Sequence, residues 1–287
     1  MNVNARLFSI ARPVVMGILN VTDDSFFDGG RYVDDAAIVR RAEQILSDGA
    51  AIIDLGAVST RPGAADVPEA EEWRRLERAL SLITKHFPDA VISVDTWRSM
   101  VAERSVNAGA AIVNDISGGT FDPEMFATVG RLHVPYVLTH TTAKPDRMQQ
   151  QTLGDEPLAE VLRFFGERID ALKQAGCVDI IVDPGFGFGK TLEQNYLLME
   201  NLPAFRIFGF PILVGISRKS MIYNLLKINP QSALNGTTVL NTVALRKGAA
   251  ILRVHDVREA VEAMKLCEAL SVHSPSQPAL DDFSYSL

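Results

Sequence analysis

The sequence has little cysteine. Only Cys177 and Cys267 occur among its 287 residues, too few for a disulfide framework. No secretory signal pattern opens the chain, and no apolar run approaches the roughly 18 residues of a membrane-spanning helix. We therefore expect a soluble protein of a reducing compartment, located in the cytoplasm and not attached to a membrane.

The sequence also lacks an excess of positive charge. Its formal net charge at pH 7 is −7, which argues against general nucleic-acid binding. Any phosphate site must then be a local pocket and not a basic face. The few cysteines and histidines form no cluster with zinc-ligand spacing, and no serine lies in a nucleophile elbow.

A short motif recurs through the chain. The letters Gly-Ala-Ala-Ile begin at Gly49, Gly109 and Gly248, each time after an amphipathic stretch and before a short apolar run. A glycine suits the left-handed end of a helix, and Gly176 stands in the same position before a further run. Repeated helix–glycine–strand units indicate parallel β-strands that alternate with helices.

The whole chain fits this alternation. Eight short apolar runs are predicted to be strands, at residues 14–19, 52–55, 91–94, 111–113, 136–138, 180–182, 212–214 and 251–254. Helical periodicity is found at residues 36–46, 69–83, 100–108, 158–175, 194–202, 239–246 and 257–269. The number of strands and the length of the chain that they span predict an α/β protein with a single-domain (β/α)₈ TIM barrel. A doubly wound open sheet is the alternative.

We expect three segments along the chain. Residues 1–13 are predicted to be a lead-in, residues 14–270 the barrel, and residues 271–287 a flexible, polar and proline-rich tail. The long loops at 22–31 and 59–68 follow the first two strands. Loops of this length at the catalytic face of a barrel usually close over substrate.

Polar residues stand where the predicted strands end. Any one of them alone is more simply a cap or a satisfied core group, but together they place polar side chains at one face of one barrel. They are Asn20, Ser59, Thr60, Arg61, Asp95, Asn114, Asp115, His140, Asp183, Ser217, Arg218, Lys219, Arg253 and His255.

These residues divide into two chemical groups. Asp95, Asn114 and Asp183 suit a flat heterocycle with an amino group beside a ring N–H, since a carboxylate accepts two parallel hydrogen bonds from that edge. Lys219 is a donor for a ring carbonyl or nitrogen. Arg61, Arg253 and His255 are donors for phosphate or carboxylate oxygens. The amide oxygen of Asn20 is a suitable ligand for Mg²⁺ beside phosphates.

The stretch at residues 180–190 is the most distinctive of the chain. An apolar run ends at Asp183, and Pro184 opens a loop that contains three glycines and two phenylalanines. The loop ends in Gly189-Lys190-Thr191, like a Walker A loop. Such a loop requires a glycine where Pro184 stands, which argues against a nucleotide P-loop. A simple turn with Asp183 as a cap is the other alternative.

Seven motifs taken together resemble those of bacterial dihydropteroate synthase. They occupy residues 16–22, 59–63, 93–96, 114–116, 183–190, 217–220 and 253–257, in the family's order. The resemblance runs from about residue 14 to about residue 268. It implies a transferase that joins 7,8-dihydropterin-6-ylmethyl diphosphate to 4-aminobenzoate in folate synthesis, with Mg²⁺ as cofactor and sulfonamides as competitive inhibitors.

The resemblance also implies roles for individual residues. The pterin would be held by Asp95, Asn114, Asp183 and Lys219. The diphosphate would be held by Asn20, Thr60, Arg253 and His255, with Asn20 as the metal ligand. The 4-aminobenzoate site would comprise Thr60, Arg61, Pro62, Phe188, Ser217 and Lys219. The catalytic residues would be Asp95, Lys219, Arg253 and His255, and family likeness suggests a homodimer.

The residues favour a dissociative, SN1-like path. Departure of diphosphate leaves a methylene cation conjugated with the pterin, which Asp95 and Asp183 stabilise before the neutral aryl amine attacks. Two rival functions remain open. One is a pterin-binding methyltransferase domain that uses methyltetrahydrofolate, and the other is a binding subunit without turnover.

The chain departs from the family in two places. Asp23 stands where proline is common, and Thr139-His140-Thr141 stands where many members have Met-His-Met. The second change lies near the expected floor of the pterin pocket. Both leave substrate affinity and sulfonamide sensitivity open, and neither removes a residue assigned to chemistry.

Overall fold

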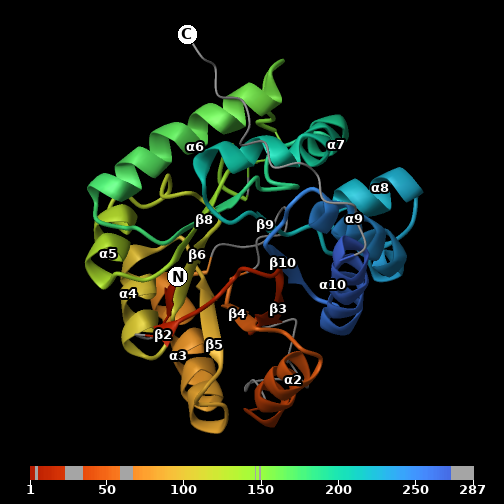
Figure 1. Cartoon of the computed structure of the whole chain (residues 1–287). Coiled ribbons are helices and arrows are strands. Elements are labelled where there is room, and N and C mark those ends of the chain that lie inside the picture. Colours follow the sequence, from red (N-terminus) through yellow and green to blue (C-terminus); the bar gives the residue numbers. More distant parts are fainter. Residues whose placement is uncertain (4–5, 23–34, 59–66, 146, 149, 273–287) are drawn as a thin grey trace, which may run out of the picture.

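The computed structural model describes residues 1–3, 6–22, 35–58, 67–145, 147–148 and 150–272. Eight parallel strands form one sheet that curls into a barrel, with helices around it (Figure 1). The strands are β3 (Val14–Asn20), β4 (Ile52–Gly56), β5 (Val91–Asp95), β6 (Ile112–Asp115), β7 (Tyr136–Thr139), β8 (Ile180–Asp183), β9 (Leu213–Val214) and β10 (Ile251–Val254).

The barrel closes between β8 and β9. The strand order β8-β7-β6-β5-β4-β3-β10-β9 leaves these two strands at its ends. A parallel bridge joins Val182 to Ile212, and the amide of Val182 donates to the carbonyl of Pro211 at 2.9 Å. The predicted (β/α)₈ barrel is therefore confirmed, and the open sheet is wrong.

Helices connect successive strands and cover the outside of the barrel (Figure 1). They are α2 (Asp35–Ser47), α3 (Glu69–His86), α4 (Ser99–Asn107), α5 (Met125–Leu132), α6 (Pro157–Gln174), α7 (Leu192–Glu200), α8 (Ser220–Leu226), α9 (Leu234–Arg246) and α10 (Val257–Val272), with 3₁₀ turns η1 (Leu202–Phe208) and η2 (Pro230–Ser232). The repeated glycines act as predicted: Gly49, Gly109 and Gly248 have φ values of 99°, 109° and 100°.

Alternate residues of each strand pack on opposite sides of the barrel wall. Val15, Ile53 and Leu138 pack outward with the helices. The inward residues at one end form a separate apolar cluster: Met16, Ile52, Ile112, Val137, Ile181, Leu213 and Ile251. Val3 of the hairpin β1 (Asn2–Val3) and β2 (Arg6–Leu7) joins this cluster, so the hairpin covers the N-terminal end of the barrel. The C-terminal end is thus the end where polar side chains can line a site.

Some predictions fall outside the described residues, and some boundaries differ. Asp23, most of both long loops and residues 273–287 lie outside the description, and α10 continues to Val272. Among the helices, α5 and α8 were not foreseen, and α9 begins before the predicted residue 239. No helix within the described ranges combines the length and apolar character needed to cross a bilayer. The cytoplasmic location stays a prediction.

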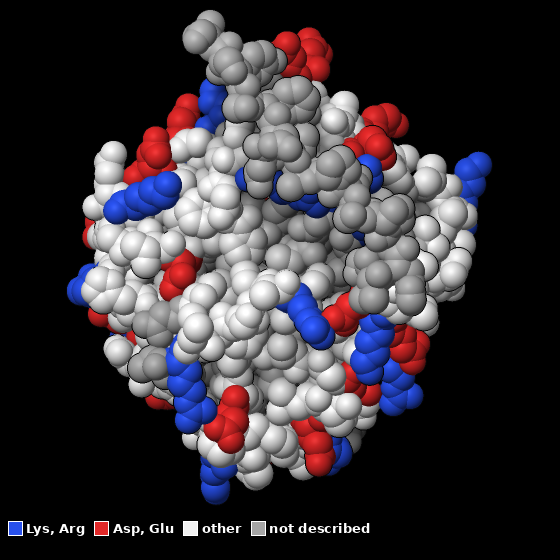
Figure 2. Space-filling model, in the orientation of Figure 1, with Lys and Arg blue, Asp and Glu red and all other residues white. Residues whose placement is uncertain are grey.

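Charge on the face drawn in Figure 2 is of both signs. Lysine and arginine alternate with aspartate and glutamate around the margin, and no broad surface of one sign is seen. This distribution agrees with the net charge of −7 and gives that face no extended basic patch for nucleic acid.

Candidate active site

The described residues predicted for the site converge at the C-terminal end of the barrel. Arg253 on β10 donates to Asp95 on β5 at 2.6 Å, across the barrel. A Cβ atom built on Gly215 would lie 3.8 Å from Arg253 Cδ and 3.9 Å from Asp183 Oδ2, so β8, β9 and β10 meet at the same place. Asn20, Asn114, Phe188, Ser217, Lys219 and His255 lie at the same strand ends, whereas Ser59, Thr60, Arg61 and Pro62 lie outside the described residues.

The sequence prediction missed Asp54, which lies at the centre of this site. Its side chain is fully buried on β4, and it accepts hydrogen bonds from Arg253 Nε at 2.6 Å and from Asn114 Nδ2 at 3.1 Å. A lone carboxylate inside the apolar run at residues 52–55 was the available signal. A charge there requires a buried partner, which Arg253 supplies.

Arg253 therefore connects the residues predicted to bind an anion with the carboxylates predicted to bind a heterocycle. Its guanidinium binds Asp54 and Asp95 together, so the basic residue expected to face an anion is fixed by carboxylates expected near the heterocycle. This pairing raises the pKa of Arg253 and keeps it charged. The fork shape of guanidinium allows it to hold both carboxylates through Nε and Nη2, and no described residue accepts a hydrogen bond from Nη1.

The carboxylates of the site lie in a water-poor environment. Burial raises the pKa of Asp95 to about 7 against the opposing effect of Arg253, and the negative charge of Asp54 adds to the rise. Burial likewise raises the pKa of Asp183, although Lys219 and the amide of Gly185 oppose it. Groups with strongly shifted pKa values that meet in one place are typical of a functional site.

Lys219 lies between the loop after β8 and Asp183. Its ammonium donates to the carbonyl of Phe186 at 2.5 Å and lies 4.3 Å from the ring centroid of Phe188. Burial lowers its pKa to about 8, while the charge of Asp183 opposes that shift. Lys219 is thus a half-buried cation that the loop holds in place, and it forms no direct ion pair with the described residues.

The loop at residues 184–190 is not a P-loop. Lys190 is 5% exposed and donates to the carbonyls of Gly185 and Phe188 at 2.8 and 3.0 Å, so its ammonium is used inside the protein. The alternative of a turn capped by Asp183 is partly right, because Asp183 Oδ1 accepts from the amide of Gly185 at 2.8 Å. Thr191 then begins α7 with a capping box completed by Gln194.

His255 is held from both sides. Ser217 Oγ lies 3.1 Å from His255 Nδ1 and accepts from the His255 amide at 3.2 Å, and Arg41 donates to the His255 carbonyl at 2.9 Å. Burial, with Arg253 nearby, lowers the pKa of His255 to about 4. The imidazole is therefore neutral at pH 7. In the tautomer in which Nδ1 accepts from the Ser217 hydroxyl, Nε2–H is the donor toward the site.

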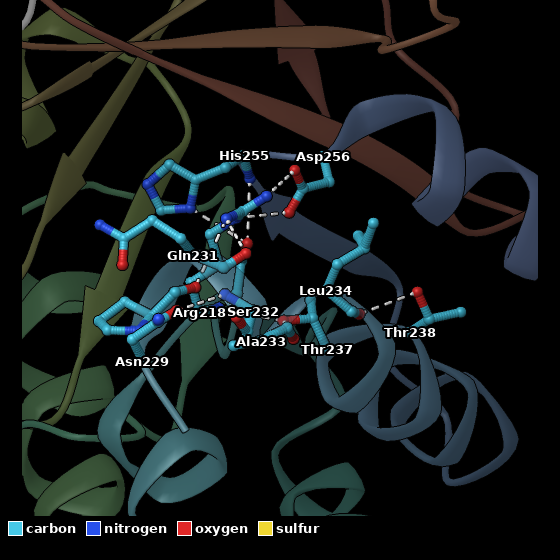
Figure 3. A network of polar contacts seen from close by, with 12 residues as sticks. Arg218, Asn229, Gln231, Ser232, Ala233, Leu234, Thr237, Thr238, His255 and Asp256 are labelled. Carbon is cyan, nitrogen blue, oxygen red and sulfur yellow. Dashed lines mark hydrogen bonds and ion pairs between the residues drawn. The ribbon is translucent and has the colours of Figure 1, made fainter. Parts of the chain in front are cut away.

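Arg218, beside Lys219 in the sequence, has a structural role. It forms a two-pronged ion pair with Asp256 at 2.7 and 2.9 Å and donates to the carbonyl of Gln231 at 3.0 Å (Figure 3). Its backbone has a φ of 56°. Arg218 thus fixes the strand-end segment that carries Ser217 and Lys219, and its charge is already used by Asp256.

Asp115 and His140 also have structural partners. Asp115 accepts from Tyr136 at 2.6 Å and from the amides of Ser117 and Gly119 at 2.7 and 2.9 Å. His140 lies beside Lys190, with 2.9 Å between Nδ1 and Nζ. For these two strand-end residues the simpler interpretation, a satisfied buried polar group, is the better one.

The chain matches a known protein family over most of its length. Residues 16–255 match the family model described as pterin binding enzyme, a range that contains every predicted site residue. The chain is 43% identical over 262 residues to dihydropteroate synthase of Escherichia coli strain K12, covering 91% of this chain and 92% of that protein.

Solved structures agree with this match. The dihydropteroate synthase of Yersinia pestis, in complex with a sulfonamide drug, has a TM-score of 0.89 and 39% identity and covers 95% of this chain and 99% of that one. The enzyme of Xanthomonas albilineans, with 4-aminobenzoic acid, has a TM-score of 0.88 and 36% identity and covers 96% and 98%.

Proposed function

We propose the reaction of this protein from one premise: the chain belongs to the family of pterin-binding enzymes, and within it to the dihydropteroate synthases. It condenses 7,8-dihydropterin-6-ylmethyl diphosphate with 4-aminobenzoate and releases 7,8-dihydropteroate and diphosphate. The observation that carries the proposal is the meeting of Asp95, Asp183, Lys219 and Arg253 at one end of the barrel. The matched relatives are synthases, which favours this reaction over methyl transfer.

The pterin is bound by the buried carboxylates and their neighbours. Asp183 accepts from the amino edge of the heterocycle, and Asp95 and Asn114 face it from the neighbouring part of the wall. Lys219 donates to a ring acceptor. The burial of these groups supports the assignment, because a hydrogen bond to a charged group in a dry site contributes about 1.5–3 kcal/mol.

The diphosphate is bound by Asn20, Thr60, Arg253 and His255. The guanidinium of Arg253 supplies positive charge, and neutral His255 supplies a hydrogen bond through Nε2–H. Their positions are supported by the fixed orientation of both side chains, through Asp54 and Asp95 for Arg253 and through Ser217 for His255. Donors that are already oriented need no rearrangement as negative charge grows on the leaving oxygen.

Asn20 suits one ligand position of Mg²⁺. A Cβ atom at Gly56 would lie 3.1 Å from Asn20 Oδ1 and 3.5 Å from Asp95 Cβ, so glycine keeps the space between these side chains open. The described ranges contain no cluster of three or more His, Cys, Asp or Glu residues that would hold a metal alone. Magnesium would therefore bind through Asn20, diphosphate oxygens and water, and when bound it supplies positive charge beside the leaving group.

The reaction follows a dissociative, SN1-like path. The bond between the pterin methylene and the diphosphate oxygen breaks first, and its electrons leave with diphosphate. Asp95 and Asp183 stabilise the cation that remains, and the amine nitrogen of 4-aminobenzoate then forms the new C–N bond and loses a proton. Positional exchange of ¹⁸O within the substrate diphosphate, measured without 4-aminobenzoate, tests this order. Absence of exchange would contradict it.

The 4-aminobenzoate site is formed by Thr60, Arg61, Pro62, Phe188, Ser217 and Lys219. Phe188 offers an apolar ring beside the Lys219 ammonium, and it packs with Ile116 and Met148. Sulfonamides compete for this site. The similar Yersinia pestis enzyme was solved in complex with a sulfonamide drug, which supports sulfonamide binding by this chain.

We also propose a homodimer. Helices α7, α8, α9 and α10 are neighbours around the barrel (Figure 1). Each carries at least one exposed apolar side chain: Leu197, Leu225, Leu226, Val239, Leu266 and Leu270. Exposed apolar side chains on neighbouring helices favour an interface between copies of the chain. Light scattering at micromolar concentration should give twice the monomer mass, and a Leu226→Glu variant should give the monomer mass.

One assay tests the proposed reaction. The purified protein is given the pterin diphosphate with or without 4-aminobenzoate and Mg²⁺, and both diphosphate and dihydropteroate are quantified. We expect sustained release of diphosphate only with 4-aminobenzoate and Mg²⁺, in equal amounts with dihydropteroate. Pterin binding without turnover would refute the synthase in favour of a binding subunit, and methyl transfer from methyltetrahydrofolate would indicate the methyltransferase.

A further inference from the structure

The buried ammonium of Lys190 has no role in the reaction proposed above. Within the described part of the chain its hydrogen-bond partners are all neutral: Gly185 O at 2.8 Å, His140 Nδ1 at 2.9 Å, Phe188 O at 3.0 Å and His140 O at 3.3 Å. No carboxylate in the described part of the chain lies within ion-pair distance of the Lys190 ammonium. Burial lowers the pKa of His140 to about 2, so its imidazole is neutral and Nδ1 is an acceptor for the ammonium.

A buried cation without an ion pair is costly. Burial lowers the pKa of Lys190 to about 7, while the charge of Asp183 opposes that shift, so the hydrogen bonds of the ammonium must offset its desolvation. A neutral side chain would avoid this desolvation cost. The position therefore calls for a role that needs several hydrogen-bond donors at one point.

The loop that Lys190 holds makes unusually close backbone contacts. Gly185, Gly187 and Gly189 have φ values of 71°, 81° and 62°. A Cβ atom on Gly185 would lie 1.9 Å from the carbonyl oxygen of His140, so the loop lies directly against the segment after β7. The ammonium of Lys190 fastens the loop to that segment, because it binds the carbonyls of both sides.

The far side of the loop has its own neutral anchors. Asn195 on α7 accepts from the amide of Gly187 at 2.7 Å, and Thr191 caps the same helix. These contacts fix where the loop joins α7. The carbonyl of Phe188 is instead bound by Lys190, and the carbonyl of Phe186 and the ring of Phe188 contact Lys219. The chain of contacts thus runs from Lys190 through the loop to Lys219.

We propose that Lys190 is a positioning residue, whose ammonium sets the loop at residues 185–189 so that Phe188 and Lys219 face 4-aminobenzoate correctly. This role rests on the proposed function, since it concerns the aminobenzoate half of that site. Three of the four pterin-binding residues, Asp95, Asn114 and Asp183, lie on strands, whereas Lys219 contacts the loop. The effect should therefore fall on 4-aminobenzoate more than on the pterin.

The test compares three variants with the parent protein. Lys190→Met keeps the length of the side chain and removes its donors, and Lys190→Gln keeps amide donors on a shorter chain. Thr191→Ala is the matched control, because it weakens the capping box at the same loop without touching the ammonium. Thermal unfolding verifies that each variant is folded, and Lys190→Gln carries the test if Lys190→Met does not fold.

For Lys190→Met we expect the KM for 4-aminobenzoate and the inhibition constant of a sulfonamide to rise at least tenfold, with the KM for the pterin diphosphate within threefold of the parent. The KM for 4-aminobenzoate and the inhibition constant of Lys190→Gln should lie between the values of the parent and of Lys190→Met. Thr191→Ala should lower the melting temperature without changing either KM more than threefold. An unchanged KM for 4-aminobenzoate, an equal rise in both KM values, or an equal effect of Thr191→Ala would overturn the proposal.

A readout that does not depend on turnover separates this proposal from the function. Trp97 packs against the cluster that contains Phe188, and Trp73 is the other tryptophan of the chain. In a Trp73→Phe background, Lys190→Met should shift the emission of Trp97, and Thr191→Ala should not. An inactive parent in which this shift occurs would refute the reaction and leave the loop contact standing, whereas an active parent without the shift would refute the role of Lys190.

Discussion

Replacement of Asp54 by asparagine removes one of the two carboxylates that orient the guanidinium of Arg253. In the parent, Asp54 accepts from Arg253 Nε and from Asn114 Nδ2 and is fully buried. In Asp54→Asn the amide is nearly the same size, so packing is kept. Arg253 then retains Asp95 as its one charged partner among the described residues. The amide introduced at residue 54 faces the side-chain amide of Asn114.

The magnitude follows from the contacts that are lost. A hydrogen bond to a charged group contributes about 1.5–3 kcal/mol, and complete loss of one partner of a buried ion pair costs about 3–5 kcal/mol. Because Asp95 still binds Arg253, we expect the Asp54→Asn substitution to cost about 3 kcal/mol, the lower end of the second range. At about 1.4 kcal/mol per factor of ten, kcat/KM for the pterin diphosphate should fall about 100-fold. The free energy of unfolding should fall by about 2–3 kcal/mol.

The assay is diphosphate release at several pterin concentrations, with urea unfolding measured on the same preparations. Asp48→Asn is the control, since Asp48 pairs at 3.2 Å with Arg258, whose side chain is 66% exposed. A surface pair of this kind contributes about 0–1 kcal/mol, so this variant should match the parent in kcat/KM. If Asp54→Asn stays within threefold of the parent in kcat/KM, Arg253 does not depend on Asp54 and the account of its orientation is refuted.

Three other substitutions and the pH profile test the same structure. Asp183→Asn should weaken pterin binding by about 1.5–3 kcal/mol, since half of a charged pair of hydrogen bonds is lost; calorimetry measures it, and unchanged affinity would count against the assignment. Phe188→Leu should change sulfonamide inhibition more than pterin affinity, and the reverse order in inhibition assays would contradict its placement. Thr139→Val should raise the free energy of unfolding by about 1 kcal/mol, because the Thr139 hydroxyl is buried without a partner among the described residues; no gain in urea unfolding would show that the hydroxyl is satisfied. The pH profile of kcat/KM should rise through about pH 7 as Asp95 ionises and fall above about pH 8 as Lys219 loses its proton, and a flat profile between pH 6 and 9 would disprove these two charge states.

The fold was accessible from the sequence because its strands and helices repeat a simple pattern. The run at residues 52–55 is followed by Gly56, and the run at 180–182 lies between Asp179 and Asp183; each lies within one residue of the observed strand. The helix α5 was missed because its eight residues give too few turns for a periodic pattern, and Gly130 lies within it. The helix α8 has seven residues and was missed for the same reason.

Most residues of the site were predictable from the sequence, but the contacts between them were not. Asp95 and Asp183 were found because each ends an apolar run. Asp54 was missed because it lies inside such a run, and Arg253 was assigned to the anion alone. Their contact joins positions 199 residues apart and depends on the closure of the barrel, which no local pattern contains. The use of Lys190 as an internal anchor likewise required coordinates, because its sequence context imitates a phosphate loop.

The central claim is that one end of the barrel holds the heterocycle through its carboxylates and the diphosphate through Asn20, Arg253 and His255. A crystal structure of the protein with the pterin diphosphate and Mg²⁺ tests it most directly. The account predicts the amino edge of the ring against Asp183, and the diphosphate within hydrogen-bond distance of Arg253 and His255. A ring bound away from Asp183, or a diphosphate that contacts neither Arg253 nor His255, would contradict it.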